Sequence, residues 1–129
     1  MSAHEKIEGF LINLGFTFEQ INDDSWVIND EEKGIEQVAV ITADPLVVIR
    51  VNVMAVPDEK REEFYRKLLE LNAADLIHGA YAIEGDGVLL VDTLEAETMD
   101  VEEFQASLDA IGLALAQHYP ILSGYRNSE

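Results

Sequence analysis

Two neighbouring runs of β-branched residues, at positions 36–43 and 46–56, constrain the fold of this chain more than any other feature. Asp44 and Pro45 separate the two runs, and this pair of residues is typical of a turn. Strands joined by so short a turn must run antiparallel. The sequence therefore predicts an antiparallel pair of strands at the centre of the chain.

The two faces of the second strand differ in character. Its odd positions are all apolar, namely Val47, Ile49, Val51, Val53 and Ala55, whereas its even positions are Leu46, Val48, Arg50, Asn52 and Met54. We expect the odd face to meet the core and the even face to be only partly covered by the rest of the chain. Val48, Arg50, Asn52 and Met54 are therefore candidate residues for binding a partner.

Apolar residues recur with helical spacing in three further segments. These are positions 2–14, positions 58–74 and a segment that begins near Asp100, in which Pro120 should end or kink the helix near Tyr119. The apolar stripes consist of Ile7, Phe10, Leu11 and Leu14 in the first segment, Phe64, Leu68 and Leu71 in the second, and Val101, Phe104, Leu108, Ile111 and Leu115 in the third.

Shorter strands are predicted at 16–21, 26–29, 78–84 and 88–94, and Gly85-Asp86-Gly87 joins the last two as a hairpin. The order is then one helix, three or four strands, a helix, two strands and a helix. We predict the α+β class, with an antiparallel sheet and helices packed against it, in a single domain that spans residues 1–129.

The chain is strongly acidic, because 8 Lys and Arg residues against 26 Asp and Glu residues give a net charge of −18. Such a field repels phosphates and anionic lipids, so we expect no nucleic acid and no membrane among the partners. The acidity serves either solubility or a partner with basic groups, and composition leaves both open. The start does not resemble a signal peptide and the chain has no cysteine, so we expect a cytoplasmic protein.

Motifs that carry chemistry are missing from the sequence. His4, His78 and His118 lie in different predicted elements, without a His or Cys partner at metal-ligand spacing, so we expect them to be solvated or locally satisfied. Adjacent carboxylates do not converge on one face of a helix or strand. No phosphate-binding loop or nucleophile elbow occurs. We therefore predict no catalytic residues, no cofactor and no metal site.

Residues 64–122 contain an ordered set of features that ends in a long amphipathic helix. The set comprises Leu68-Leu69-x-Leu71-Asn72, a strand of small residues, the Gly85-Asp86-Gly87 hairpin, an acidic spacer and His118-Tyr119-Pro120-Ile121-Leu122. It resembles the YbjN-type domain family and, more distantly, the class I type III secretion chaperones of the Tir-chaperone (CesT) kind. The resemblance implies an α-β-β-β-α-β-β-α fold, commonly a homodimer, and for the secretion chaperones a non-catalytic role in holding an extended cargo segment.

Two functions remain open. The chain is either a protein-binding module that holds a basic or apolar segment of a partner polypeptide, or a regulator with a small-ligand pocket between sheet and helices. Trp26 either belongs to a partner-binding groove or is ordinary core. Leu69 and Tyr81 are candidate dimer-interface residues, provided that they lie outside the core stripe.

Overall fold

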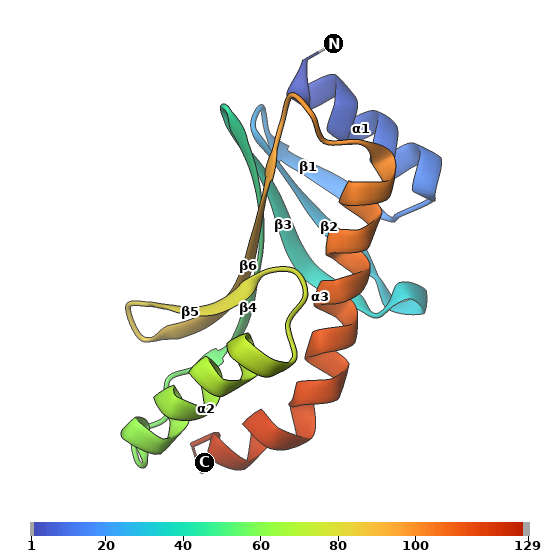
Figure 1. Cartoon of the computed structure of the whole chain (residues 1–129). Helices are drawn as coiled ribbons and strands as arrows, with labels where there is room; N and C mark the ends of the chain where they lie inside the picture. Colours follow the sequence, from blue (N-terminus) through green and yellow to red (C-terminus); the bar gives the residue numbers. More distant parts are fainter. Residues whose placement is uncertain (1, 128–129) are drawn as a thin grey trace.

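A computed structural model of the chain describes residues 2–127. In this part of the chain, a six-stranded antiparallel sheet carries helices α1 and α3 on one face (Figure 1). The elements are α1 (Ala3–Leu14), β1 (Phe18–Asn22), β2 (Ser25–Asp30), β3 (Ile35–Ala43), β4 (Leu46–Ala55), α2 (Arg61–Ala74), β5 (Ala80–Glu84), β6 (Gly87–Glu95) and α3 (Val101–Leu122), with short 3-10 helices at Glu31–Lys33 and Ser123–Tyr125. The predicted α+β class is confirmed.

The strands lie in the order β1-β2-β3-β4-β6-β5, and every neighbouring pair is antiparallel. Four strands precede α2, which settles the choice between three and four that the sequence leaves open. A tight turn separates β1 from β2, because the N–H of Asp24 donates to the side-chain oxygen of Asn22 at 2.9 Å. This turn makes a separate hairpin of the first two strands.

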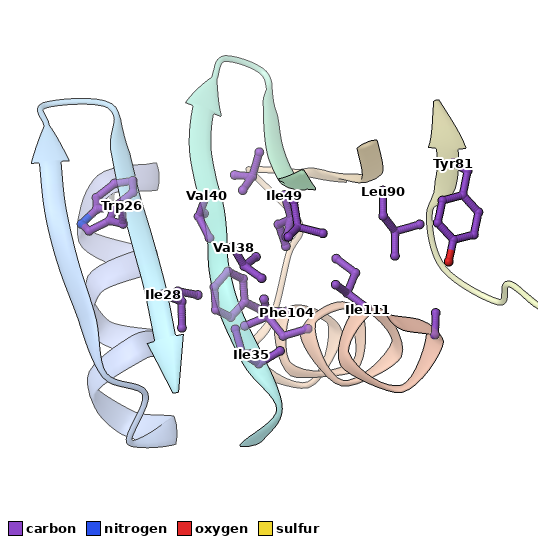
Figure 2. Packing of buried hydrophobic residues seen from close by; sticks show 14 of the residues in the cluster. Trp26, Ile28, Ile35, Val38, Val40, Ile49, Tyr81, Leu90, Phe104 and Ile111 are labelled. Atoms are coloured by element: carbon purple, nitrogen blue, oxygen red, sulfur yellow. The ribbon is translucent and has the colours of Figure 1, made fainter. Parts of the chain in front are cut away.

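The core lies between the sheet and the helices α1 and α3 (Figure 2). Val47 and Ile49 of β4 are fully buried there, as the alternation of β4 predicts. The predicted stripe of α2 is also buried, and so are Ile7 and Leu11 of α1. Further residues of this cluster are Trp26, Ile28, Val38, Val40, Leu90, Phe104, Leu108 and Ile111.

Helix α3 begins where the sequence predicts and ends later. Asp100 and Glu103 form a capping box, in which the N–H of Glu103 donates to the Asp100 carboxylate at 2.8 Å. Of the two predicted effects of Pro120, an end or a kink near Tyr119, the structure excludes the end, because α3 continues through Pro120 to Leu122. A proline in the last turn removes a single backbone donor, and the N–H of Ser123 still donates to the carbonyl of Tyr119.

A β-bulge in β4 changes the face on which Met54 lies. Asn52 is opposite Leu89 in β6, but Met54 is opposite Val88, so Val53 is the additional residue. Directly opposed residues share one face of a sheet, and Val88 is fully buried in the core. The prediction that Met54 shares the open face with Val48 is therefore wrong, because one extra residue reverses the alternation.

Candidate functional site

The face of the sheet opposite α1 and α3 is mostly apolar, and we call it the open face. Cross-strand pairing places Val27, Ala39, Arg50 and Val91 in one row across β2, β3, β4 and β6. The next row contains Ile41 of β3 and Val48 of β4. These apolar side chains are half-buried, and Leu46 and Ile21 at the margins are exposed. The predicted residues Val48, Arg50 and Asn52 lie on this face, whereas Met54 does not.

Arg50 places a positive charge on the open face and forms a salt bridge with Glu84. Its guanidinium donates to the carboxylate of Glu84 in β5 at 3.0 Å. Because β4 and β5 both flank β6, this salt bridge spans β6. Leu89 of β6 lies between Asn52 and Ala82 in the register and is only 5% exposed, although it points away from the main core. The bridge therefore lies over an apolar strand and holds Arg50 extended along the surface.

Trp26 belongs to the core and not to a surface groove. Its side chain is 0% exposed, and its ring centroid is 5.0 Å from that of His4 in α1. Figure 2 shows Trp26 on the side of the β1–β2 hairpin that faces α1. Its Nε1 has no hydrogen-bond partner among the described residues. Of the two roles that the sequence leaves open for Trp26, the structure favours ordinary core, so we remove Trp26 from the candidate partner-binding residues.

Tyr81 is also internal, which removes it from the candidate dimer interface. It is 6% exposed, and its hydroxyl lies 2.7 Å from Nδ1 of His118 in α3. Nε2 of His118 lies 3.1 Å from the carboxylate of Asp75, directly after α2. Burial, with a contribution from the negative charge of Asp75, raises the pKa of Tyr81 from 10.0 to about 12.

His118 was expected to be solvated or locally satisfied, and the structure shows a buried histidine with two partners from other elements. The sequence carries a signal for its burial, because His118 follows Ile111 by one heptad and so continues the apolar stripe of α3. No sequence signal identifies Tyr81 and Asp75 as its partners, since both lie far away along the chain.

Asn72 of α2 covers part of the outer edge of β5. Its side-chain oxygen accepts the N–H of Tyr81 at 2.7 Å, and its side-chain nitrogen donates to the carbonyl of Tyr81 at 3.2 Å. The amide thus imitates the hydrogen bonding of a neighbouring strand at this position. An exposed strand edge is a template for pairing with another chain, and Asn72 blocks it locally.

A cavity of about 500 Å³ lies where β3 and β4 separate, and we call it the strand opening. The pairing of β3 with β4 ends at Ala39 and Arg50, and the two strands diverge beyond that point (Figure 1). α3 passes beside the gap. The lining includes Glu31, Glu36, Val51, Asn52, Val53, Met54, Tyr81, Gly112, Leu115, Ala116, Tyr119 and Arg126.

A second apolar surface lies on and after α2. Leu69 is 67% exposed, Ile77 is 90% exposed, and Ile83 of β5 and Tyr65 of α2 are also exposed. Two basic residues of α2, Arg66 and Lys67, pair within the helix. Both approach the carboxylate of Glu70, at 3.5 and 3.6 Å.

Nowhere in residues 2–127 do three or more His, Cys, Asp or Glu side chains gather in a way that could hold a metal ion. None of the helices in this range is long and apolar enough to cross a membrane.

Several solved structures share this fold. A chain of the heterodimeric ExoU–SpcU complex from the type III secretion system of Pseudomonas aeruginosa has a TM-score of 0.72 at 16% identity, over 88% of this chain and 95% of that chain. YbjN from E. coli has a TM-score of 0.67 at 12% identity, over 92% of each chain. The Yersinia pestis type III secretion chaperone SycH, in complex with a fragment of YscM2, has a TM-score of 0.64 at 14% identity, over 90% of this chain and 98% of that chain.

These likenesses agree with both branches of the resemblance seen in the sequence, the YbjN type and the secretion chaperones. At such low identities they show a common fold. No curated protein matches the sequence. The CesT_Tir_1 family model, however, matches residues 1–128. With nearly its whole length matched by that model, this chain belongs to the CesT_Tir_1 family.

Proposed function

We propose that this protein is a non-catalytic, chaperone-like binding module that holds a segment of a partner polypeptide on the open face. The observation that supports this proposal most is the apolar row of Val27, Ala39 and Val91, which neither α1 nor α3 covers. A surface of this kind, rimmed by polar residues, is typical of a protein-binding site. The solved relatives include the HopA1–SchA chaperone–effector complex.

The partner segment would combine apolar anchors with basic residues. Apolar side chains fit against Ile41 and Val48, and basic ones fit the acidic field of a chain with a net charge of −18. Complementary charge of this kind speeds encounter and is screened by salt.

We propose further that the protein acts as a homodimer in the cytoplasm. Leu69 of α2 and Ile77 shortly after it are exposed apolar residues, and neither belongs to a strand of the open face. Burying such side chains against a second copy would remove them from water. The open face would then remain free on each protomer.

Affinity capture from the native cell extract, followed by mass spectrometry, tests the binding role. The informative variant is Val48→Lys, which places a charge in the open face while its stem can still cover apolar surface. The matched control is Leu113→Lys on α3, where the native leucine is already exposed. We expect Val48→Lys to lose the captured partner with little change in melting temperature, and Leu113→Lys to retain it. Equal capture by both folded variants would reject the open face as the binding surface.

A small-ligand regulator is the second candidate function, and the strand opening is the observation that favours it. Its volume of about 500 Å³ falls within the range of ligand pockets, and it lies between sheet and helix. A defined small molecule that co-purifies with the protein and raises its melting temperature would favour this function over the first.

A further inference from the structure

Within the sheet, the strand opening exposes one edge of β4 that pairs with no other strand of the described residues. Within residues 2–127, positions 51–55 of β4 pair with β6, except at the bulge residue Val53, and have no strand on their other side. The cause lies in β3, where Gln37 has a φ of 52°. The N–H of Gln37 donates to the side-chain oxygen of Asn29 in β2 at 2.8 Å, which fastens the start of β3 toward β2 and away from β4.

Small residues of α3 keep the strand opening free of side chains. Gly112 and Ala116 are one helical turn apart and both line the cavity. A Cβ on Gly112 would lie 3.3 Å from the side chain of Ile35, so α3 passes close to the start of β3 and closes one side of the gap. Leu115 and Tyr119 provide apolar walls.

The rim of the opening carries charge of both signs. Glu31 and Glu36 contribute carboxylates from the side of β3. On the opposite side, the guanidinium of Arg126 stacks on the ring of Tyr119, 5.7 Å from its centroid. Arg126 therefore already has a partner, whereas the carboxylates give the wall next to β3 a negative character that favours a basic ligand.

The unpaired edge of β4, the apolar walls of α3 and the acidic rim together favour an extended polypeptide over a compact small molecule. A strand edge presents N–H and C=O groups in alternation, and a second strand satisfies both together. Side chains of that strand would alternate between the apolar walls formed by α3 and the acidic rim. The divergence of β3 leaves this edge without a strand partner in the middle of the sheet and not only at its outer strands.

We propose that the strand opening binds an extended segment of another polypeptide by strand addition to residues 51–55 of β4, with apolar residues toward α3 and a lysine or arginine beside Glu31 and Glu36. This inference rests on the proposed protein-binding function and adds a second contact to it. The open face would hold apolar anchors of the partner, and the strand opening would hold its backbone.

The test uses the full chain and a short synthetic peptide of alternating lysine and valine, with amide NMR spectra and amide hydrogen exchange as readouts. We expect shift changes and slower exchange concentrated at positions 51–55. A peptide N-methylated at alternate residues should bind about tenfold more weakly, because it lacks the donors that a strand edge requires. Binding should also weaken as salt rises.

Two pairs of variants test the site. Ala116→Phe fills the opening, and the control Gln117→Phe places the same ring on the neighbouring exposed position of α3. Glu36→Lys reverses a rim charge, and the control Glu32→Lys makes the same change outside the lining. We expect Ala116→Phe and Glu36→Lys to weaken peptide binding by about tenfold and both controls to retain it.

Equal binding by Ala116→Phe and Gln117→Phe, or protection confined to the outer strands β1 and β5, would overturn the inference. Concentration-dependent protection of positions 51–55 without peptide would overturn it as well, since a second copy of the chain would then be the occupant. If Val48→Lys abolishes partner capture while Ala116→Phe does not, the proposed function stands and the strand opening is not part of it.

Discussion

The hydroxyl of Tyr81 in β5 lies 2.7 Å from Nδ1 of His118 in α3, although the two residues are separated by 37 positions in the chain. The opposite ring nitrogen of His118 lies 3.1 Å from the carboxylate of Asp75. With the imidazole protonated at Nε2, the hydroxyl donates to Nδ1 and the imidazole donates to the carboxylate. One buried histidine thus links α3 to β5 and to the end of α2.

The raised pKa of Tyr81 predicts a loss of stability at high pH. The pKa is about 12 in the folded state, against an ordinary value of 10.0, so the folded protein holds this proton more tightly than the unfolded chain. Its contribution is complete below pH 10 and is lost as the pH rises toward 12. Urea unfolding across this window should show the loss, and Tyr81→Phe should show a smaller dependence on pH than the native protein.

The matched control for that experiment is Tyr65→Phe, because Tyr65 is exposed. It should keep the pH dependence of the native protein. The result rests on the comparison between the two variants. An identical pH dependence in Tyr81→Phe and Tyr65→Phe would contradict the role of the buried hydroxyl.

Asn72→Ala should destabilise the protein and expose the edge of β5. The variant removes both hydrogen bonds from the side chain of Asn72 to the backbone of Tyr81, which we expect to cost about 1–3 kcal/mol. Amide exchange at Tyr81 should become faster because its N–H loses its acceptor. Asn13→Ala on the exposed side of α1 is the control and should change neither quantity. Unchanged exchange at Tyr81 would show that Asn72 does not protect the edge.

Local patterns predicted most of the fold, because the alternation of β4 and the stripes of α1 and α2 report directly which side chains are buried. The failures have one local cause and one long-range cause, and an alternation or stripe pattern reveals neither. Met54 lies on the core face because a bulge at Val53 reverses the alternation. Tyr81 is internal, and its hydroxyl contacts a histidine of α3 that lies 37 positions away in the chain.

The candidate site was likewise predictable only in part. Alternation alone predicted the position of Val48, Arg50 and Asn52. They lie on the face of β4 where polar residues occur among apolar ones. The strand opening was not predictable, because it depends on the positive φ of Gln37 and on the separation of β3 from β4. Glutamine has no marked preference for that conformation, so no residue type in the sequence signals the divergence.

Trp26→Ala should cost about 3–5 kcal/mol in the free energy of unfolding, because the ring is 0% exposed and its removal leaves a large cavity beneath α1. Leu113→Ala on the exposed side of α3 is the control and should change stability by less than about 1 kcal/mol. Chemical denaturation of both variants measures the difference. A change of similar size in the two would show that Trp26 is not a core residue in solution.

The exposed apolar surface of α2 predicts where a dimer would form. Leu69 and Tyr65 are four residues apart on α2 and therefore lie on one side of that helix, and Ile77 follows shortly after its end.

Replacing Leu69 and Ile77 together with aspartate would place charges in an interface that otherwise removes apolar area from water. We expect the native protein to sediment as a dimer at micromolar concentration and the double variant as a folded monomer, since neither side chain is buried within the chain. The melting temperature of the native protein should rise with its concentration, and that of the double variant should not. Ile12→Asp is the control, because Ile12 is 68% exposed on α1, far along the chain from α2, and it should leave the dimer intact. A native protein that is monomeric throughout this range, or a double variant that remains dimeric, would refute the assignment of this surface.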